Sequence, residues 1–348
     1  MRTGHYKERW SQYVALSDNP TVWAWVAALL AALLIAPVVL DGYSTTLLVS
    51  ALIAVVGAVG LNVLTGTTGL ISLGQAGFLA VGAYTNGVLL VDHHWPVWAT
   101  LPASGVVAAA VSLVVGIPSL RLKGLYLAIT TLAFSFIINH VILYTESVTH
   151  GPNGIFVNGA KILGFDVQRG APLYYLVLGV AVLSVLTALN LARTRIGRAW
   201  MAIRDHDVAA RVMGIDLVRY KLLAFMVSSF IVGVAGALIS LQIRFINIDV
   251  FALILSIEAI AFLILGGLGS IGGAILGAIF LSFLPEMIRL AFAMLGGSTA
   301  SLLGNYLFEI RGMAYGVVIV VFLRWVPDGL IGLWRDIRTY WSNWPLAY

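Results

Sequence analysis

Long apolar stretches recur along the chain at the length that a lipid bilayer requires. A helix needs about 20 largely apolar residues to cross the hydrocarbon core. On this template the sequence predicts ten membrane helices, at 22–40, 46–64, 76–91, 97–117, 125–143, 172–192, 218–242, 251–268, 272–295 and 306–325. The third segment is short and the residues before it could re-enter the membrane, so we expect eight to ten spans. The pattern predicts an all-α, polytopic membrane protein.

The composition agrees with this pattern. Of the 348 residues, 60% are hydrophobic and 10% are charged, and the mean hydropathy is +0.98. These values exclude a soluble globular domain. The sequence contains no cysteine, which excludes thiol chemistry and agrees with a bacterial inner-membrane protein that needs no disulfides.

Lysine and arginine concentrate in alternate connections, and this asymmetry predicts the orientation. Cytoplasmic loops of membrane proteins carry the excess of positive charge. The basic regions are 1–21, 118–124, 193–221 and the residues that follow the last helix, and ten spans place all four on one side. We therefore expect two cytoplasmic termini, with an amino-terminal tail at 1–21, a transmembrane domain at 22–325 and a carboxy-terminal tail at 326–348.

Neither the amino terminus nor the overall charge indicates an additional function. The first 20 residues are too polar for a signal peptide, so we expect an uncleaved first helix and a mature chain that begins near Met1. The pI of ≈ 9.5 follows from the topology. Since the basic residues are spread over tails and loops, without an aromatic-interleaved patch, we expect no nucleic-acid partner.

Motifs for catalysis and metal binding are missing from the sequence. None of the four lysines lies in a Gly-Lys-Ser/Thr phosphate loop, so we expect no ATPase site in this chain. No Gly-x-Ser-x-Gly elbow or zincin motif indicates a hydrolase. The six histidines show no metal-ligand spacing, so we expect neither a metal site nor a cofactor in this chain.

Residues 60–77 interrupt the apolar pattern with five glycines and a cluster of polar side chains. Glycine destabilises a helix interior by about 1 kcal/mol relative to alanine, and unsatisfied backbone groups are costly in hydrocarbon. Such a segment is tolerated where a helix breaks inside protein or beside water, as it does at several transport sites. It predicts a discontinuous helix on a translocation path that includes Asn62, Thr65, Gly66, Gly69, Ser72, Gly74, Gln75 and Gly77.

A second glycine cluster lies at 265–277, in the other half of the chain. Two such segments suggest an internal repeat whose interface holds the path, which adds Gly266, Gly267 and Gly269. Helix packing is the alternative for each glycine, because small residues such as Gly273 and Gly277 let helices approach closely. The intramembrane carboxylate of Glu258 could line the path, pair with an arginine or stabilise a dimer.

The basic connection at 193–217 has a helical pattern of apolar and polar positions. Ala199, Ile203, Ala210 and Met213 can share an apolar stripe, while arginine and aspartate occupy other positions. The pattern predicts a short amphipathic helix. It could lie along the membrane as an anchor or dock on another protein.

Three motifs carry a resemblance to a known family. They are Leu-Asn-Val-Leu-Thr-Gly-Thr-Thr-Gly-Leu-Ile-Ser-Leu-Gly-Gln-Ala-Gly at 61–77, Arg-Ile-Gly-Arg-Ala-Trp-Met-Ala-Ile-Arg-Asp at 195–205 and Ser-Ile-Glu-Ala-Ile-Ala-Phe-Leu-Ile-Leu-Gly-Gly-Leu-Gly-Ser-Ile-Gly-Gly at 256–273. Over nearly its whole length the chain resembles the permease subunits of ATP-binding-cassette importers for branched-chain amino acids, and it looks like the longer of their two permeases. It departs from them after the third motif, where these permeases often have a proline and this chain has Gly273 and Ala274.

The resemblance implies a transporter subunit in membrane lipid, without an enzymatic site of its own. Its implied partners are a second homologous permease, two ATPase subunits that bind the ATP, and an external substrate-binding protein. The matching coupling segment implies contact with the ATPase through Arg195, Gly197, Arg198, Ala199, Arg204, Asp205, Ala209, Ala210 and Gly214. Alternatives are a urea or short-amide permease of the same family and a self-sufficient ion-coupled carrier or channel.

Overall fold

Helices make up most of the described chain. The computed structural model describes residues 20–119, 122, 124–162, 165–166, 170–295, 307–326 and 328–343. The main helices are α2 (Pro20–Val39), α3 (Gly42–Leu61), α4 (Gln75–Val91), α5 (Val97–Ser119), α6 (Leu125–Tyr144), α8 (Gly170–Arg193), α11 (Leu217–Ile243), α12 (Leu253–Gly266), α13 (Ile271–Leu295) and α15 (Leu307–Trp325). Every predicted membrane segment overlaps one of these helices.

Shorter elements connect the main helices. The amphipathic elements are α9 (Arg195–Asp205), α10 (Asp207–Val212) and α16 (Gly329–Asn343). The connection between α6 and α8 contains α7 (Glu146–Thr149), η2 (Gly151–Asn153), β1 (Ile155–Phe156), β2 (Lys161–Ile162) and β3 (Phe165–Asp166). After α11 come β4 (Phe245–Ile246) and η3 (Ile248–Phe251). The antiparallel pairs are β1 with β4, where Ile155 faces Ile246, and β2 with β3.

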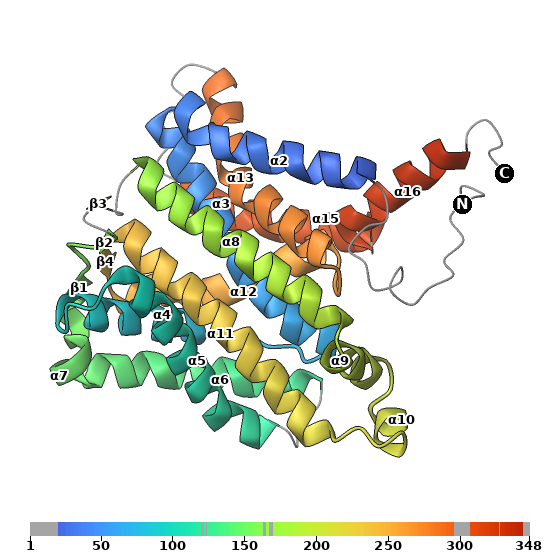
Figure 1. The fold of residues 1–348 in the computed structure, drawn as a ribbon, viewed down its shortest axis with the longest axis horizontal. Helices are drawn as coiled ribbons and strands as arrows, with labels where there is room; N and C mark the ends of the chain where they lie inside the picture. Colours follow the sequence, from blue (N-terminus) through green and yellow to red (C-terminus); the bar gives the residue numbers. More distant parts are fainter. Residues whose placement is uncertain are drawn as a thin grey trace.

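The bundle has two distinct ends (Figure 1). The β1–β4 pair and α7 lie together at the left of the view, whereas α9, α10 and α16 lie toward the right. We call these the β1 end and the α9 end. Because the basic connection at 193–217 lies at the α9 end, the two ends also differ in charge.

Glycines let the central helices touch backbone to backbone. α11 packs along α3, α4 and α5. A Cβ atom on Gly82 of α4 would overlap the carbonyl of Gly233 on α11, and a Cβ atom on Gly236 would overlap the backbone of α4. Between the same two helices, the buried Asn86 donates a hydrogen bond to Ser240 (2.7 Å). Close approach at small residues is how helices associate within a membrane, where hydrophobic burial between helices gives little driving force.

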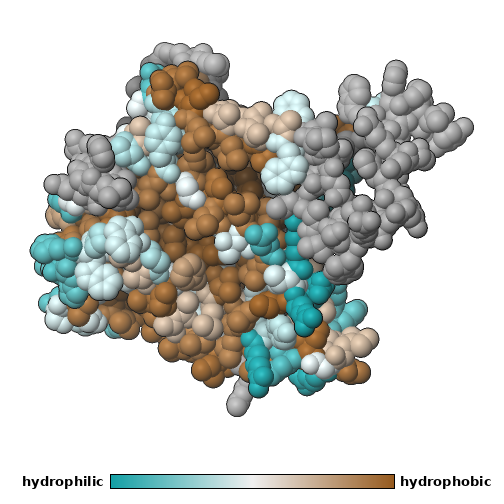
Figure 2. All heavy atoms as spheres, viewed as in Figure 1, coloured by the Kyte–Doolittle hydropathy of each residue, from teal (hydrophilic) through white to brown (hydrophobic). Residues whose placement is uncertain are grey.

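The surface and the helix lengths agree with a membrane protein. Within the described residues, seven helices are long and apolar enough to cross a membrane, and Trp23–Val39 and Gln75–Val91 are shorter apolar helices. Figure 2 shows hydrophobic side chains across the middle of the visible face and hydrophilic ones toward the sides. The prediction of an all-α, polytopic membrane protein is confirmed, with a helix count that agrees only roughly.

Two segments are more structured than the sequence indicated. The predicted carboxy-terminal tail contains the amphipathic helix α16, and the connection at 144–171 contains two-residue strands, which are too short to produce an alternating sequence pattern. The amino-terminal tail at 1–21 lies outside the described residues, apart from the first two residues of α2. The internal repeat stays a prediction.

Both glycine clusters lie where two helices join at the α9 end. α3 continues into a π-helix at Asn62–Thr67 (η1), and the irregular residues 69–74 lead to α4, which confirms the predicted discontinuity. The second cluster, at 265–277, spans the end of α12, the short turn after it and the first residues of α13. Gly69 (φ +75°), Gly267 (φ +112°) and Gly269 (φ +81°) adopt conformations that other residues rarely tolerate, and these conformations end the helices.

Candidate functional site

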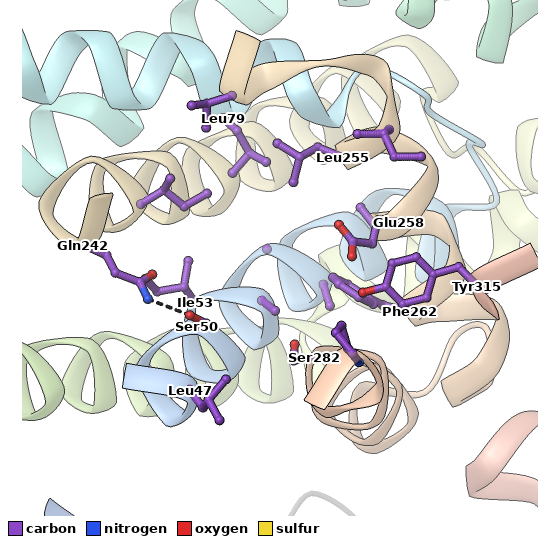
Figure 3. A pocket seen from close by; sticks show the side chains of 18 of the residues that line it. Leu47, Ser50, Ile53, Leu79, Gln242, Leu255, Glu258, Phe262, Ser282 and Tyr315 are labelled. Atoms are coloured by element: carbon purple, nitrogen blue, oxygen red, sulfur yellow. Dashed lines mark hydrogen bonds between the residues drawn. The ribbon is translucent and has the colours of Figure 1, made fainter. Parts of the chain in front are cut away.

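A cavity of ≈ 820 Å³ lies among α3, α11, α12, α13 and α15. Most of its wall is aliphatic or aromatic, as Leu47, Ile53, Leu79, Leu255 and Phe262 illustrate (Figure 3). The lining residues come mainly from the parts of these helices that are nearer the β1 end. This volume and lining are typical of a site for a small, largely apolar molecule.

A few polar groups interrupt the apolar wall. Figure 3 shows the carboxylate of Glu258 projecting into the cavity from α12, and its side chain is half-buried. On the opposite wall, Gln242 donates a hydrogen bond to Ser50 (2.6 Å) and thereby joins α11 to α3. These groups give the cavity a charge and hydrogen-bonding capacity, which an apolar wall alone would lack.

A cluster of charged residues lies on the cavity wall between α3 and α13. The hydroxyl of Tyr43 donates to Glu286 (2.6 Å), and Arg289 forms an ion pair with the same carboxylate, with Nε 3.0 Å from Oε2. The Arg289 guanidinium also lies 5.5 Å from the centre of the Tyr43 ring. Because Arg289 and Glu286 neutralise one another, this cluster adds polarity to the cavity with little net charge.

Gln75 closes the cavity on the side of the α9 end. Its Nε2 donates to the carbonyl oxygen of Gly57 (3.1 Å), and the side chain is only 3% exposed. The next residue, Ala76, donates its backbone N–H to Ser256 (2.9 Å). These two bonds fix the start of α4 against α3 and α12, so the broken segment forms the floor of the cavity.

Beyond this floor, three segments meet at what we call the glycine junction, formed by Asn62, Gly66, Gly69, Gly269 and Arg204. The backbone N–H of Gly269 donates to Oδ1 of Asn62 (3.2 Å). Nη1 of Arg204, on α9, donates to the carbonyl oxygen of Gly66 (3.0 Å). The junction therefore joins both glycine clusters to the predicted coupling segment.

Threonine hydroxyls bond to backbone carbonyl oxygens of the π-helix and of the irregular residues that follow it. The hydroxyls of Thr67 and Thr68 both donate to the carbonyl oxygen of Val63, at 2.5 and 3.0 Å. The Thr65 hydroxyl donates to the carbonyl oxygen of Leu70 (3.2 Å), across the end of the helix. Buried backbone groups need such partners, so the polar residues of the first cluster stabilise its broken geometry.

The other predicted path residues pack against neighbouring helices. Ser72 accepts a hydrogen bond from the N–H of Gly74 (3.2 Å), and a Cβ atom on Gly74 or Gly77 would lie 3.0 Å from backbone atoms of α6. Gly266 touches α13 and Gly267 touches the start of α16. Of the predicted path residues, the structure thus brings Gln75 and Glu258 to the cavity and Asn62, Gly66, Gly69 and Gly269 to the junction.

The predicted coupling segment folds as two helices with a break at His206. Along α9, Gly197, Ala199, Trp200 and Ile203 are buried against the chain itself. The indole of Trp200 donates to the carbonyl oxygen of Tyr220 (2.8 Å), which ties α9 to α11. Their burial leaves these residues unable to contact a partner. The segment's exposed predicted residues are Arg195, Arg198, Arg204, Asp205, Ala209 and Gly214, whereas Ala210 is buried.

Two exposed apolar side chains on this segment, Val208 and Val212, were missed by the sequence interpretation, and a third, Met213, was assigned to the apolar stripe but is exposed as well. Val208, Val212 and Met213 are 69%, 82% and 85% exposed. Val208 and Val212 are four residues apart on α10 and therefore share one helix face. That spacing was visible in the sequence, but the position of α10 relative to the bundle was not. We refer to these three residues as the α10 patch.

The described residues contain no group of three His, Cys, Asp or Glu side chains that could hold a metal ion. Among the described residues, the junction and the cavity are held by hydrogen bonds, by the ion pairs Arg289–Glu286 and Arg204–Asp205, and by close packing. Chemically, the arrangement offers a mostly apolar compartment into which the carboxylate of Glu258 projects. Next to it lies the glycine junction, where the helix ends are in tight contact. The arrangement also includes the exposed surface helix α10.

Comparison with known proteins identifies the family. Residues 43–323 match the family described as branched-chain amino acid transport system, permease component. The high-affinity branched-chain amino acid transport system permease protein LivM of Escherichia coli (strain K12) is 33% identical over 314 residues, which are 82% of this chain and 69% of that protein.

More distant relatives have the same kind of description. A probable branched-chain amino acid transport permease protein LivH of Methanocaldococcus jannaschii is 27% identical over 303 residues, which are 82% of this chain and 91% of the relative. The high-affinity permease protein BraD of Pseudomonas aeruginosa is 24% identical over 208 residues, which are 59% of this chain and 63% of the relative. Because the family match covers most of the chain, this protein belongs to the family of permease components of branched-chain amino acid transport systems.

Proposed function

We propose that the chain is the transmembrane permease subunit of an ATP-binding-cassette importer for branched-chain amino acids. The family match supports the transporter class. The observation that carries the substrate class is the cavity, whose wall is mostly aliphatic and aromatic but contains the projecting carboxylate of Glu258. Such a wall suits a leucine, isoleucine or valine side chain, while a carboxylate suits the ammonium group of an amino acid.

The cavity and the glycine junction are the two ends of one path in this proposal. The α9 end faces the cytoplasm, because exposed arginines gather there and cytoplasmic loops carry the positive charge. The cavity then opens toward the outside, and the junction closes the path on the inside. Alternating access requires that a second conformation close the outer side and separate the helix ends at the junction.

The α10 patch is the surface that we assign to the ATPase subunit. Adjoining exposed apolar side chains mark surfaces that interact with a protein or a membrane, and we assign this one to a protein partner. Aspartates and arginines surround the patch, notably Asp205 and Arg211, and both are exposed. A small apolar knob with a charged rim is suited to a groove on a partner that moves as a rigid body.

The complete importer in this proposal contains two permeases, two ATPases and an external binding protein. Similarity to both a LivM and a LivH protein supports a pair of homologous permeases. The ATPases supply the energy, and the binding protein delivers the solute at the β1 end. The chain itself contributes the path and the coupling helix and performs no catalysis.

Reconstitution of the importer in proteoliposomes tests this function. The chain is purified with its second permease and two ATPases, the binding protein is added outside, and uptake of radiolabelled L-leucine is measured with and without ATP inside. We expect uptake that needs ATP and every subunit. The matched control is an ATPase whose phosphate-loop lysine is replaced by alanine, which should abolish uptake while leaving the complex intact.

Competition by other solutes separates the remaining candidates. Excess unlabelled isoleucine and valine should reduce leucine uptake, whereas urea and acetamide should leave it unchanged. Competition by urea or acetamide alone would assign the permease to short amides. Uptake by the chain in liposomes that lack ATPases would contradict the importer and favour a self-sufficient carrier or channel.

A further inference from the structure

Arg204 points into the bundle, although it belongs to the segment that is predicted to contact the ATPase. Its Nη1 donates to the carbonyl oxygen of Gly66 (3.0 Å), a residue 138 positions earlier in the chain. Its Nε donates to Asp205 (3.3 Å). The side chain is 39% exposed, so more than half of its surface is covered. Arg204 thus spans from the surface helix α9 to the end of the predicted path.

The glycines of the junction are the residues that make room for Arg204. A Cβ atom on Gly69 would lie 2.9 Å from Cγ of Arg204, and one on Gly269 would lie 2.6 Å from Nη1. Both glycines also have positive φ angles, where other residues are strained. Two glycines from different clusters therefore form the surface against which one arginine side chain lies.

The two glycine clusters are joined directly as well. Gly269 donates its N–H to Oδ1 of Asn62, and a Cβ atom on Gly66 would lie 2.7 Å from that same backbone nitrogen. No space for a solute remains where backbones are this close. Opening the path at the α9 end must therefore separate the connection at 62–69 from the turn at 267–269.

Trp200 and Arg204 tie α9 to different parts of the bundle. Trp200 is bonded to the carbonyl oxygen of Tyr220 at the start of α11, and Arg204, one helical turn later, is bonded to Gly66. A tilt of α9 about the buried Trp200 would withdraw the Arg204 guanidinium from the junction. The exposed α10 patch follows directly after Arg204, so a partner bound there would act on this end of α9.

We propose that Arg204 is a latch: its bond to the carbonyl oxygen of Gly66 holds the glycine junction closed until the ATPase displaces α9. This inference rests on the proposed function, because it names the contact through which the ATPase would act on the path. Arg204 is a positioning residue in this role. It acts through the carbonyl oxygen of Gly66 and stabilises the closed arrangement of the two glycine clusters.

Thiol labelling from the α9 side tests the latch in the assembled importer. The natural chain has no cysteine, so a single introduced thiol gives an unambiguous signal. Ala58 is suitable because it lines the cavity, lies one turn before Asn62 and is fully buried. The A58C chain, with its partner subunits, is placed in inside-out membrane vesicles, and the rate of labelling by a membrane-impermeant maleimide is measured without ATP.

We expect slow labelling in the A58C parent and roughly tenfold faster labelling after Arg204→Ala, a change that corresponds to about 1.4 kcal/mol. Arg204→Lys retains a charged donor but loses the reach and fork geometry of the guanidinium, so it should label at a rate between those of the parent and Arg204→Ala. Arg219→Ala is the matched control, since Arg219 is an exposed arginine at the same end, paired with Asp216 and outside the junction. It should label at the parent rate.

The other outcomes overturn the latch. Equal labelling of the parent and Arg204→Ala, with both complexes intact, would show that Arg204 does not hold the junction closed. Loss of ATPase co-purification without a change in labelling would make Arg204 a docking residue. If Arg204→Ala does not reach the membrane, Arg204→Lys is tested in its place. The latch then requires that Arg204→Lys be labelled faster than the Arg219→Ala control. Because labelling uses no solute, failure of the latch is distinct from failure of leucine uptake.

Discussion

The cavity and the glycine junction occupy opposite ends of the same helices, and they are built in opposite ways. The cavity is lined by large side chains that stand apart and enclose ≈ 820 Å³. At the junction, Gly66, Gly69 and Gly269 bring backbones and one arginine so close that added Cβ atoms would collide with neighbours. A region that admits a solute needs large side chains that line a space. A region that closes tightly needs glycines, because without side chains the backbones can touch.

The comparison also shows that the polar residues at the two ends are used differently. At the junction, the threonine hydroxyls of η1 bond to the backbone of the broken segment, and Asn62 accepts a hydrogen bond from the turn between α12 and α13. In the cavity, the Glu258 carboxylate projects into the space. Polar residues at the two ends therefore have different functions, and substitutions at the two ends should produce different defects.

Gly66→Ala should have the largest effect, because it inserts a methyl group into the junction. The added Cβ atom would overlap the Asn62 amide and approach the backbone nitrogen of Gly269. Overpacking of this kind costs about 1–3 kcal/mol, and we expect leucine uptake to fall to background. Gly179→Ala is the control, since no atom lies within 4 Å of its added Cβ. Normal uptake by Gly66→Ala would contradict the close contact.

Val212→Asp should disrupt the coupling surface and leave both the cavity and the glycine junction unchanged. A charge in the centre of the α10 patch would have to be buried against the ATPase without a partner, which weakens association strongly. We expect the ATPases to be lost on purification while the two permeases remain together. Val218→Asp is the matched control, because Val218 is exposed on the first helical turn of α11, where a negative charge is tolerated.

If Val212→Asp retains its ATPases and transports normally, the α10 patch is not the docking surface. Equal loss in Val212→Asp and Val218→Asp would indicate a general effect of charge at this end of the molecule.

Glu258→Gln should reduce transport while leaving the assembly intact. The amide retains the shape of the side chain and removes the charge that would meet an ammonium group. Loss of a charged hydrogen bond is worth about 1.5–3 kcal/mol, so we expect uptake at low leucine concentration to fall by roughly tenfold or more. Glu146→Gln, an exposed carboxylate on α7, is the control. An unchanged concentration for half-maximal uptake would remove Glu258 from solute recognition.

Gln75→Leu should have the smallest effect of the four and should act on stability. The substitution leaves the carbonyl oxygen of Gly57 without its side-chain donor at a buried position. Loss of one neutral hydrogen bond costs about 0.5–1.5 kcal/mol and should lower the midpoint of thermal unfolding in detergent. Gln242→Leu breaks a more exposed bond, to Ser50, and should lower it less. The reverse order would show that the cavity floor is not held by Gln75.

The sequence predicts the fold well because each signal for it is local. Every membrane helix follows from the length of an apolar run, and the break after α3 follows from glycines and polar residues within one short segment. The amphipathic pattern at 193–217 also predicts helices correctly. The break at His206, which divides this segment into α9 and α10, was missed because it depends on packing against the bundle.

The site is harder to predict, because it depends on contacts between distant residues. Asn62 and Gly269 were both assigned to the path, but their hydrogen bond joins residues 207 positions apart. Arg204 was assigned to coupling from its motif, and nothing in the sequence indicates its bond to Gly66. The same limit applies to Ala199 and Ala210, for which the resemblance implied contact with the ATPase, although both are buried within the chain.

Two-sided thiol labelling of an Ala259→Cys chain is the most direct test that the cavity and the junction are the two ends of one path. Ala259 lines the cavity on α12 and is 4% exposed. The complete importer is placed in right-side-out and inside-out vesicles, and labelling by an impermeant maleimide is measured with and without ATP. We predict labelling from the β1 side in the resting importer, and labelling from the α9 side only during ATP turnover. Labelling from the α9 side without ATP, or from neither side in any condition, would contradict this account.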